Sequence, residues 1–296
     1  MTTDIELQSM FVSEPLANFN GKLMPLSQVK VSVLDRGFLF GDAVYEVIRV
    51  YYGKPFLYEE HVERLKKNLE KVSIRVDVED IRRCITETLA TARYDDALVY
   101  VQVTRGAAPR THRFPHPNVV PNVLIYVSKF EDPYAQERKQ GAAVIVTNDL
   151  RWKRCDIKSV NLLANCLAAE AAHAAGCTEA LLVDDTGQII EGSRSSLFGV
   201  KDGCVLTAPL GENILPGITR RLLMKLSADC SIPMTEAAIY QDQLSDIDEL
   251  FLTSTTMDIL PVTKVDRVVI GNGAIGPVVK QLKSAFEEAV RAFVSG

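Results

Sequence analysis

Apolar and polar residues alternate along much of the first half of the chain, which is typical of strands with one buried face. This pattern predicts strands within residues 19–50, 98–104 and 122–130. In residues 61–72 and 78–91, apolar side chains instead recur three or four positions apart, and this spacing predicts two amphipathic helices. Residues 105–115 are too polar and too rich in proline for regular structure, so we expect a loop that joins two strands.

In the second half of the chain, the pattern predicts several short strands and three helices. Strands are expected within residues 142–147, 180–183, 188–191, 197–200 and 249–252, and helices within residues 160–175, 218–228 and 277–293. The polar segment 131–141 is typical of a linker, so we predict an N-terminal domain of residues 1–133 and a C-terminal domain of residues 134–296. Because strands and helices do not alternate strictly, the pattern favours two α+β domains over a doubly wound parallel sheet.

Composition narrows the class of protein without identifying a function. Hydrophobic residues make up 47% of the 296 residues and charged residues 24%, proportions that are typical of a globular chain and not of a disordered one. The formal net charge is -5 and no basic run stands out, which argues against a nucleic-acid partner. A small-molecule substrate is therefore the expected partner.

The sequence carries no pattern for a membrane, a secreted protein or a metal site. No segment approaches about 18 uninterrupted apolar residues, and acidic residues stand at the N-terminus where a signal peptide is basic. We therefore expect a cytoplasmic protein without a membrane partner. The six cysteines lie far apart and form no CxxC pair, so neither a zinc site nor a thioredoxin-like redox motif is expected.

One lysine stands where a predicted strand gives way to a predicted helix. Lys158 lies within RWKRCDIKSVN, residues 151–161, which leads into the Ala-rich helical pattern. A lysine at such a corner can be held rigidly with its amine directed into a cleft, as Schiff-base chemistry requires. Taken alone, a lysine is far more often a solvated surface residue, so only the surrounding motifs give this one weight.

Three further segments place polar groups at the ends of predicted elements. Glu191 is followed by glycine and small hydroxyl residues at a strand end, where a carboxylate can meet the edge of a planar ring. The segment LPGITRR begins a helix whose first N–H groups, at Ile218 and Thr219, form a natural phosphate cradle. Residues 253–256 offer four hydroxyl groups after an apolar strand. Each segment alone is also consistent with an ordinary turn or helix start.

Together these segments match one known pattern. Over nearly its whole length the chain resembles the fold-type IV pyridoxal-phosphate-dependent enzymes, and within them the bacterial D-amino acid aminotransferases. The resemblance is carried by DRG at 35–37 with GD at 41–42 and VYEV at 44–47, EHVERL at 60–65, QVTRG at 102–106 with PRTH at 109–112, RW at 151–152 with RCDIKS at 154–159, EGS at 191–193, GITR at 217–220 and FLTSTT at 251–256. It implies the α+β fold that D-amino acid and branched-chain aminotransferases share.

The resemblance also implies pyridoxal 5'-phosphate as cofactor and a role for particular residues. Lys158 carries the cofactor covalently and then acts as the catalytic acid and base, Glu191 binds the pyridine nitrogen, and Arg64 binds the phosphate. The implied cofactor-binding set is Arg64, Lys158, Glu191, Ser193, Leu215, Ile218, Thr219, Ser254 and Thr255. Physical chemistry agrees, because a guanidinium and a helix N-terminus hold a phosphate dianion, and a buried carboxylate holds a protonated ring nitrogen.

A loop in the first half of the chain implies the substrate. D-amino acid aminotransferases share the Arg-x-His pattern of Arg110 and His112, whereas branched-chain aminotransferases and aminodeoxychorismate lyases lack it. In the enzymes that share it, the two residues reach the neighbouring subunit's site of a homodimer. There they bind the substrate α-carboxylate with the tyrosine that matches Tyr45, which decides the enantiomer that presents its Cα–H to the lysine. Arg194 departs from the family, where serine is usual, and could narrow the pocket, bind a second carboxylate or face solvent.

The implied reaction is transamination between D-alanine and 2-oxoglutarate, which gives pyruvate and D-glutamate. An L-branched-chain aminotransferase or an aminodeoxychorismate lyase of the same fold remains the alternative, and so does an inactive protein that kept the scaffold. A nicotinamide-dependent oxidoreductase is not supported, because no GxGxxG motif follows a predicted strand.

Overall fold

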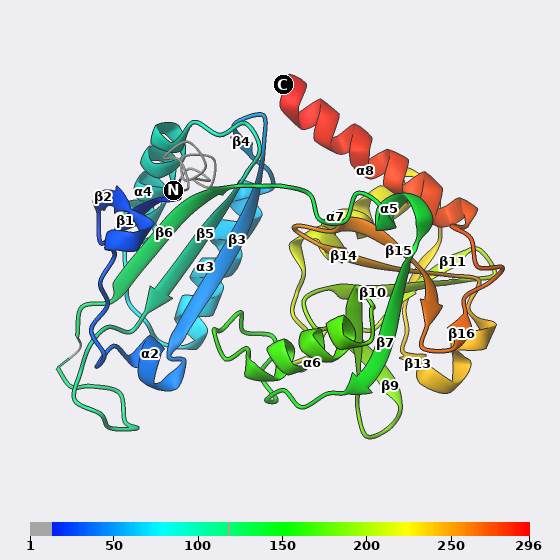
Figure 1. The fold of residues 1–296 in the computed structure, drawn as a ribbon, viewed down its shortest axis with the longest axis horizontal. Helices are drawn as coiled ribbons and strands as arrows, with labels where there is room; N and C mark the ends of the chain where they lie inside the picture. Colours follow the sequence, from blue (N-terminus) through cyan, green and yellow to red (C-terminus); the bar gives the residue numbers. More distant parts are fainter. Residues whose placement is uncertain (1–13, 118) are drawn as a thin grey trace, which may run out of the picture. The chain divides into compact units, whose positions relative to one another are not determined.

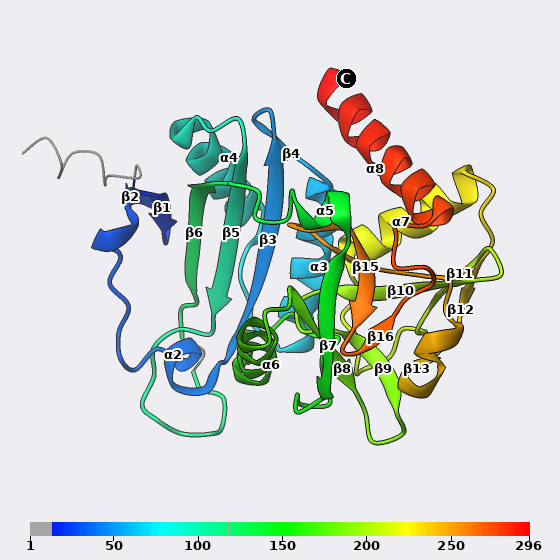
Figure 2. The same cartoon turned by 45° about the vertical axis from the view of Figure 1, so that its right-hand side comes forward.

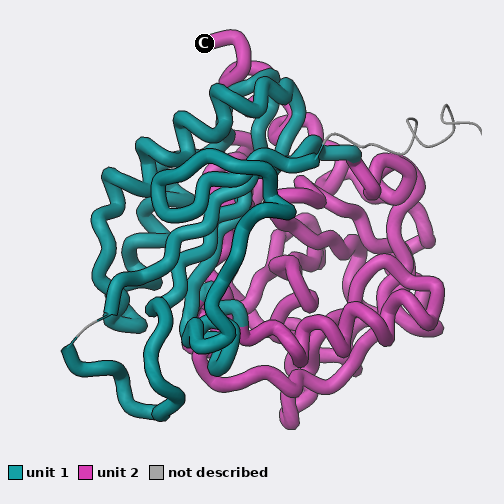
Figure 3. Tube along the Cα trace, turned by 60° about the vertical axis from the view of Figure 1, so that its left-hand side comes forward, with its two compact units in different colours: residues 1–131, 158–160 teal, residues 132–157, 161–296 magenta. Residues whose placement is uncertain are grey.

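The computed structural model describes residues 14–117 and 119–296, and the chain divides into two compact units (Figure 3). The first unit ends at Glu131 and also contains Lys158–Val160. The second unit consists of Asp132–Ile157 and Asn161–Gly296. Lys158 therefore belongs to the first unit, although Ile157, directly before it, belongs to the second. In the described part of the chain, no helix combines the length and the apolar character needed to cross a membrane.

The first unit is built on a six-stranded antiparallel sheet with the strand order β2-β1-β6-β5-β3-β4. Its strands are β1 (Leu16–Phe19), β2 (Lys22–Pro25), β3 (Ala43–Tyr51), β4 (Lys54–Pro55), β5 (Ala97–Thr104) and β6 (Asn122–Lys129). Its helices are the 3-10 helix η1 (Leu26–Gln28), α2 (Arg36–Phe40), α3 (Tyr58–Lys71) and α4 (Val78–Ala92). The two long helices cover one face of this sheet (Figures 1 and 2).

Neighbouring residues of β3 direct their side chains to opposite faces of the sheet. Val44 and Ile48 are buried, and Glu46 between them contacts α3. The opposite face carries an aromatic ladder, in which Tyr45 of β3, Tyr100 of β5 and Tyr126 of β6 stack with ring centroids 5.8 and 4.9 Å apart. The strand thus presents Tyr45 on one face and Glu46 on the other, and both belong to the candidate site.

The second unit is built on a mixed ten-stranded sheet with the order β12-β11-β10-β14-β15-β7-β8-β9-β13, in which β16 pairs with β15. Its strands are β7 (Ala142–Asn148), β8 (Glu179–Val183), β9 (Gln188–Gly192), β10 (Ser196–Lys201), β11 (Cys204–Thr207), β12 (Met234–Glu236), β13 (Ile239–Tyr240), β14 (Glu249–Ser254), β15 (Asp258–Val265) and β16 (Val268–Val269). Its helices are α5 (Glu137–Gln140), α6 (Leu163–Ala174), α7 (Ile218–Asp229), the 3-10 helix η2 (Gln241–Asp246) and α8 (Pro277–Ser295). α7 and α8 pack on each other and on β14, whereas α6 packs on β7 and β8.

The predicted helices and most predicted strands are present within a few residues of their expected bounds. The expectation of strands and turns throughout residues 19–50 was wrong at α2. The Asp35 carboxylate caps this helix by accepting a 2.7 Å hydrogen bond from the Gly37 N–H, and Gly41 ends it in the left-handed conformation, with φ 65°. A helix of five residues is too short to show a helical period in the sequence.

Candidate active site

Main-chain hydrogen bonds hold Lys158 beside the first residues of β3. The Tyr45 N–H donates to the Lys158 carbonyl at 2.9 Å, and the Val160 N–H donates to the Ala43 carbonyl at 3.3 Å. The segment thus runs antiparallel to β3, whose other edge pairs with β5. The half-buried Lys158 places its Nζ 4.3 Å from the centroid of the Tyr45 ring. Among the described residues of its unit, none forms an ion pair with this amine.

A buried polar cluster lies on the other face of β3. The Arg64 guanidinium donates two hydrogen bonds to the Glu46 carboxylate, at 2.7 and 2.8 Å, and His61 Nδ1 lies 2.8 Å from the same carboxylate. Burial acts to raise the pKa of Glu46, but the Arg64 charge and the His61 hydrogen bond outweigh it and lower the pKa to about 2. Burial lowers the pKa of His61. Glu46 therefore stays ionised and fixes the direction of the Arg64 guanidinium.

We expect Arg64→Met to destabilise the protein by about 3–5 kcal/mol, because it leaves the Glu46 charge buried without its strongest partner. Urea-induced unfolding at neutral pH measures this loss. Lys67→Met is the matched control, since Lys67 pairs with Glu63 on the exposed face of the same helix and such pairs contribute at most about 1 kcal/mol. Equal effects of the two substitutions would show that the buried cluster does not constrain the fold.

In the second unit, Glu191 of β9 is buried against an arginine. The Arg151 Nη1 donates to its carboxylate, and the Leu215 N–H lies 3.4 Å from both carboxylate oxygens. Asp149 accepts two further hydrogen bonds from the Arg151 side chain, at 2.9 and 2.7 Å. Burial raises the pKa of Glu191 to about 7 although Arg151 opposes the shift. A second cation beside this carboxylate, such as a protonated ring nitrogen, would favour its ionised form.

The start of α7 offers a cradle for an anion. Helix α7 begins after Gly217, so the N–H groups of its first turn have no acceptor within the helix. A Cβ atom at Gly217 would lie 2.8 Å from the Ser196 Oγ, so the start of α7 closely approaches the first residue of β10. The buried Thr253 Oγ1 at the end of β14 has no hydrogen-bond partner among the described residues, and Ser196 and Thr253 pair across β10 and β14. N–H and hydroxyl donors therefore gather here, with the hydroxyl groups of Thr219, Ser254 and Thr255 nearby in sequence.

Ser193, a predicted cofactor contact, and Arg194, whose role the sequence left open, both have a partner that the sequence did not indicate. The Ser193 hydroxyl donates to the buried Glu179 carboxylate, and the Ser193 carbonyl accepts a 2.6 Å hydrogen bond from Asn165. Arg194 is 54% exposed, and its Nε lies 3.6 Å from the Glu179 carboxylate. Of the three roles considered for Arg194, the structure thus favours a largely solvated side chain that pairs with a buried acid.

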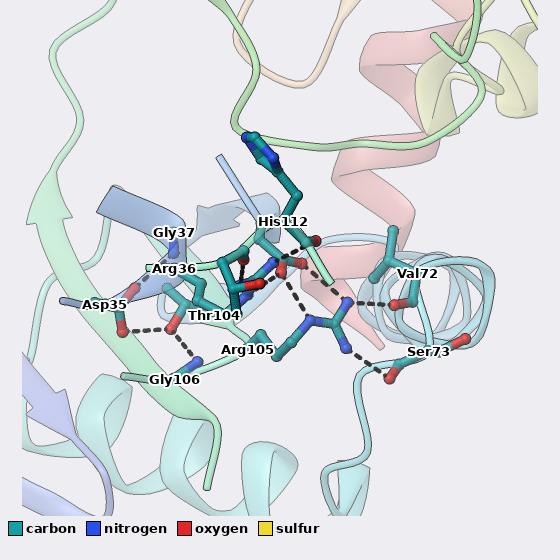
Figure 4. Close-up of polar contacts among 11 residues, drawn as sticks. Asp35, Arg36, Gly37, Val72, Ser73, Thr104, Arg105, Gly106 and His112 are labelled. Atoms are coloured by element: carbon teal, nitrogen blue, oxygen red, sulfur yellow. Dashed lines mark hydrogen bonds and ion pairs between the residues drawn. The ribbon is translucent and has the colours of Figure 1, made fainter. Parts of the chain in front are cut away.

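The loop that carries Arg110 and His112 packs on α2 (Figure 4). Both side chains are exposed, and both contact Phe40: the Arg110 guanidinium lies 5.3 Å from the ring centroid, and the His112 ring 5.7 Å away. The Arg36 Nη1 donates to the Thr111 carbonyl at 2.6 Å. The loop is thus attached to a structured element at its middle.

The predicted residues fall into two groups, one in each unit. The first unit holds Tyr45, Arg64, Arg110, His112 and Lys158, and the second holds Glu191, Ser193, Leu215, Ile218, Thr219, Ser254 and Thr255. Sequence reasoning left Glu46 out of the catalytic set and assigned no role to the charged residues Arg36, Asp42, His61, Arg105, Arg151 and Glu179. His61 and Arg64 occupy core-facing positions of the amphipathic α3 beside Leu65, and this polar interruption of an apolar face was the available signal.

Comparison with known proteins places the chain in a family. A family model described as Amino-transferase class IV matches residues 43–265. D-alanine aminotransferase of Staphylococcus epidermidis is 37% identical over 276 residues, which cover 92% of this chain and 97% of that protein. The D-alanine aminotransferase of Bacillus licheniformis is 38% identical over 274 residues, with coverage of 92% and 96%.

Solved structures agree with these relatives. A T.th. branched-chain amino acid aminotransferase, determined with pyridoxamine 5'-phosphate, superposes with a TM-score of 0.87 at 29% identity and covers 94% of each chain. The predicted α+β fold of type IV, built on an antiparallel and a mixed sheet, is confirmed. The match of the family model over most of the chain and the identity to the D-alanine aminotransferases show that this protein belongs to the class IV aminotransferases.

Proposed function

We propose that this protein transfers the amino group of a D-amino acid to a 2-oxo acid. D-alanine and 2-oxoglutarate are the proposed substrates, and pyruvate and D-glutamate the products. The observation that carries the proposal is the 37% identity to D-alanine aminotransferases over 92% of the chain. The Arg110-x-His112 loop, which packs on α2, supports it.

The donors of this chain fit pyridoxal 5'-phosphate, the cofactor of its family. When bound, the cofactor supplies a ring that withdraws electrons from the substrate Cα. Glu191, whose buried carboxylate has a raised pKa, would hold the ring nitrogen. The first turn of α7 and the hydroxyl groups of Thr219 and Thr255 would hold the phosphate, because a helix N-terminus favours anions. The buried Thr253 hydroxyl, which has no hydrogen-bond partner within residues 14–117 and 119–296, is a further polar group at the same strand end.

Arg64 would bind the phosphate, with Glu46 holding its guanidinium in place. The remaining cofactor contacts are assigned to Ser193, Leu215, Ile218 and Ser254. The Ser193 hydroxyl donates to Glu179, its N–H donates to the Ala180 carbonyl and its carbonyl accepts from Asn165, so these contacts fix Ser193 in place.

Lys158 would bind the cofactor aldehyde through Nζ and, once the substrate amine has displaced it, move a proton to and from the substrate Cα. The Nζ of Lys158 lies 4.3 Å from the centroid of the Tyr45 ring, beside the tyrosine proposed to bind the substrate. The main-chain hydrogen bonds to β3 hold the Cα of Lys158 firmly while its side chain remains able to move.

Tyr45, Arg110 and His112 would bind the substrate α-carboxylate. A guanidinium, an imidazole and a phenol supply donors for a carboxylate. We propose that the protein acts as a homodimer in the cytoplasm, with the Arg110 and His112 of each subunit reaching the site of the other. Sedimentation velocity tests the dimer directly.

An L-branched-chain aminotransferase is the second candidate, because the solved structures that resemble this chain include such enzymes at 27% and 29% identity. Initial rates with D-alanine and with L-leucine, each with 2-oxoglutarate, separate the two candidates. We expect D-alanine to be the faster substrate and the glutamate formed to be the D enantiomer. Faster turnover of L-leucine would refute the assignment to D-amino acids.

Replacing Arg110 with alanine should raise the KM for D-alanine by about 10- to 100-fold, because a hydrogen bond to a charged group contributes about 1.5–3 kcal/mol. Steady-state kinetics measures the change. Arg113→Ala is the matched control, since Arg113 is an exposed arginine of the same loop to which the account assigns no contact with substrate. If both variants kept the KM of the original protein, the loop would not bind the substrate.

A further inference from the structure

We propose that Arg36, assisted by Phe40, positions the loop of Arg110 and His112 and thereby sets the affinity for the substrate carboxylate. Both residues lie on α2, outside the set of predicted ligands. The inference rests on the proposed function, because it assigns Arg36 an effect only through a loop that binds substrate.

One carboxylate organises two buried arginines next to this loop. Asp42 Oδ2 accepts 2.7 Å hydrogen bonds from the Nε atoms of both Arg36 and Arg105, and Asp42 Oδ1 accepts a third, at 2.9 Å, from Arg105 Nη2. The two guanidinium groups are 3% and 9% exposed. Two positive charges with one negative charge carry a net charge of +1, so main-chain carbonyls must satisfy the remaining N–H groups.

Arg105 attaches the root of the loop to the end of α3. Its Nη2 and Nη1 donate to the carbonyls of Val72 and Ser73 at 2.6 and 3.0 Å (Figure 4). The next residue, Gly106, has a φ of 97°, and a Cβ atom there would lie 2.0 Å from the Val120 carbonyl oxygen. The two ends of the loop therefore approach each other closely, and the root is fixed.

Arg36 holds the middle of the loop. Its Nη1 donates to the Thr111 carbonyl at 2.6 Å, and its Nη2 lies 3.5 Å from the His112 carbonyl oxygen. Thr111 and His112 are exposed, so a buried charged side chain reaches out to an otherwise solvated stretch of main chain. These two carbonyls belong to the residues directly after Arg110, and their position determines where the Arg110 and His112 side chains begin.

Phe40 supplies the surface on which the loop side chains rest. The guanidinium groups of Arg36 and Arg110 lie 4.7 and 5.3 Å from the ring centroid, within the range of cation–π attraction. The His112 ring contacts the same ring at 5.7 Å with an interplanar angle of 56°. Among the described residues, the Arg110 side chain forms no hydrogen bond or ion pair. Phe40 is therefore the contact that orients it.

A purely structural role explains this arrangement poorly. Buried ion pairs seldom add net stability compared with apolar side chains of similar size, but they do fix one geometry. Here the geometry that is fixed is the course of a loop with two exposed side chains. Arg36 is thus a positioning residue, which acts on the substrate through Arg110 and His112.

The test compares Arg36→Met, Arg36→Lys and Phe40→Leu in the full-length protein loaded with pyridoxal 5'-phosphate. We expect Arg36→Met to raise the KM for D-alanine about tenfold while kcat changes less than about twofold, because the loop loses its anchor but the reacting groups do not. Arg36→Lys should restore part of the affinity. Phe40→Leu, which leaves the Asp42 ion pairs intact, should also raise KM and covers the case in which Arg36→Met does not fold.

Two comparisons distinguish positioning from general damage. With D-alaninamide, which has no carboxylate, the Arg36 variants should match the original protein. In the Arg36→Met, Arg110→Ala double variant, the increases in KM should not multiply, because both substitutions remove the same interaction with the substrate carboxylate. Arg49→Met is the control for loss of a buried arginine, since Arg49 also pairs with an aspartate and main-chain carbonyls but lies at the far end of β3. It should leave the KM unchanged.

The outcomes separate this inference from the proposed function. If the original protein does not turn over D-alanine, the proposed function fails. If it does turn over D-alanine, three results would refute the inference about Arg36 alone. Arg36→Met could leave the KM for D-alanine unchanged, or it could lower the rates with D-alanine and D-alaninamide equally. In the double variant, the increases in KM caused by Arg36→Met and Arg110→Ala could multiply.

Discussion

Replacing Lys158 with alanine should lower the rate of D-alanine transamination by about 10⁴-fold or more, because the substitution removes both the covalent attachment of the cofactor and the acid and base at the substrate Cα. The fold should survive. The hydrogen bonds between residues 158–160 and β3 involve main-chain atoms, which alanine keeps, and the Lys158 side chain takes part in no ion pair within the described part of its unit.

Kinetics and mass spectrometry together measure this effect. Borohydride treatment of the loaded protein should fix the cofactor to the peptide that contains Lys158, and the Lys158→Ala variant should show no such adduct. Lys153→Ala is the matched control, because Lys153 is an exposed lysine five residues earlier in the same segment. Transamination by the Lys158→Ala variant at the original rate, or an adduct on another lysine, would contradict the assignment.

Glu191→Gln should reduce kcat by about 100- to 1000-fold with a smaller change in KM, a magnitude that is typical when one preorganised electrostatic partner of a reacting group is removed. A neutral amide cannot stabilise a positive charge on the ring nitrogen, so the ring withdraws electrons less strongly from the substrate Cα. Steady-state kinetics with D-alanine measures the loss. Glu170→Gln, on the exposed face of α6, is the control and should leave kcat unchanged.

The same substitution should alter the pH dependence of stability in the protein without cofactor. Burial raises the pKa of Glu191 from 4.5 to about 7. The folded state therefore binds more protons than the unfolded state between these values, and the contribution of Glu191 to stability is present below about pH 4.5 and lost as the pH rises through 7. The difference amounts to about 3 kcal/mol. Urea unfolding at pH 5 and pH 8 should show this loss in the original protein and a smaller loss in Glu191→Gln.

The spacing of apolar residues along the sequence was sufficient to predict the long helices and strands. The apolar positions of α3 and α4 recur at helical spacing, and buried and less buried residues alternate in β5 from Ala97 to Val103, so local pattern and tertiary burial agree. Helix α2 was missed because its five residues depend on a capping hydrogen bond from Gly37 to Asp35 and not on a period. The short strands β12, β13 and β16 depend on pairing partners that local sequence does not reveal.

The side chains that pair with the site residues could not be predicted from the sequence for a related reason. Arg151 and Glu191 are 40 positions apart, and the pairing of β8 with both β7 and β9 brings their segments together. Arg36 lies on the short helix α2 and donates a hydrogen bond to Thr111, which is 75 positions away in the sequence. Such contacts depend on how strands pair and on which distant segments the fold brings together. Lys158, Glu191 and Arg64, by contrast, lie in motifs that the resemblance to a known family identified.

We propose that Lys158 and Glu191 bind the same cofactor molecule. An electron-density map of crystals of the protein loaded with pyridoxal 5'-phosphate would show both contacts. The account predicts continuous density from the Nζ of Lys158 into the cofactor, with its ring nitrogen within hydrogen-bond distance of the Glu191 carboxylate and its phosphate at the first turn of α7. A cofactor joined to another residue, or a ring nitrogen far from Glu191, would contradict the account.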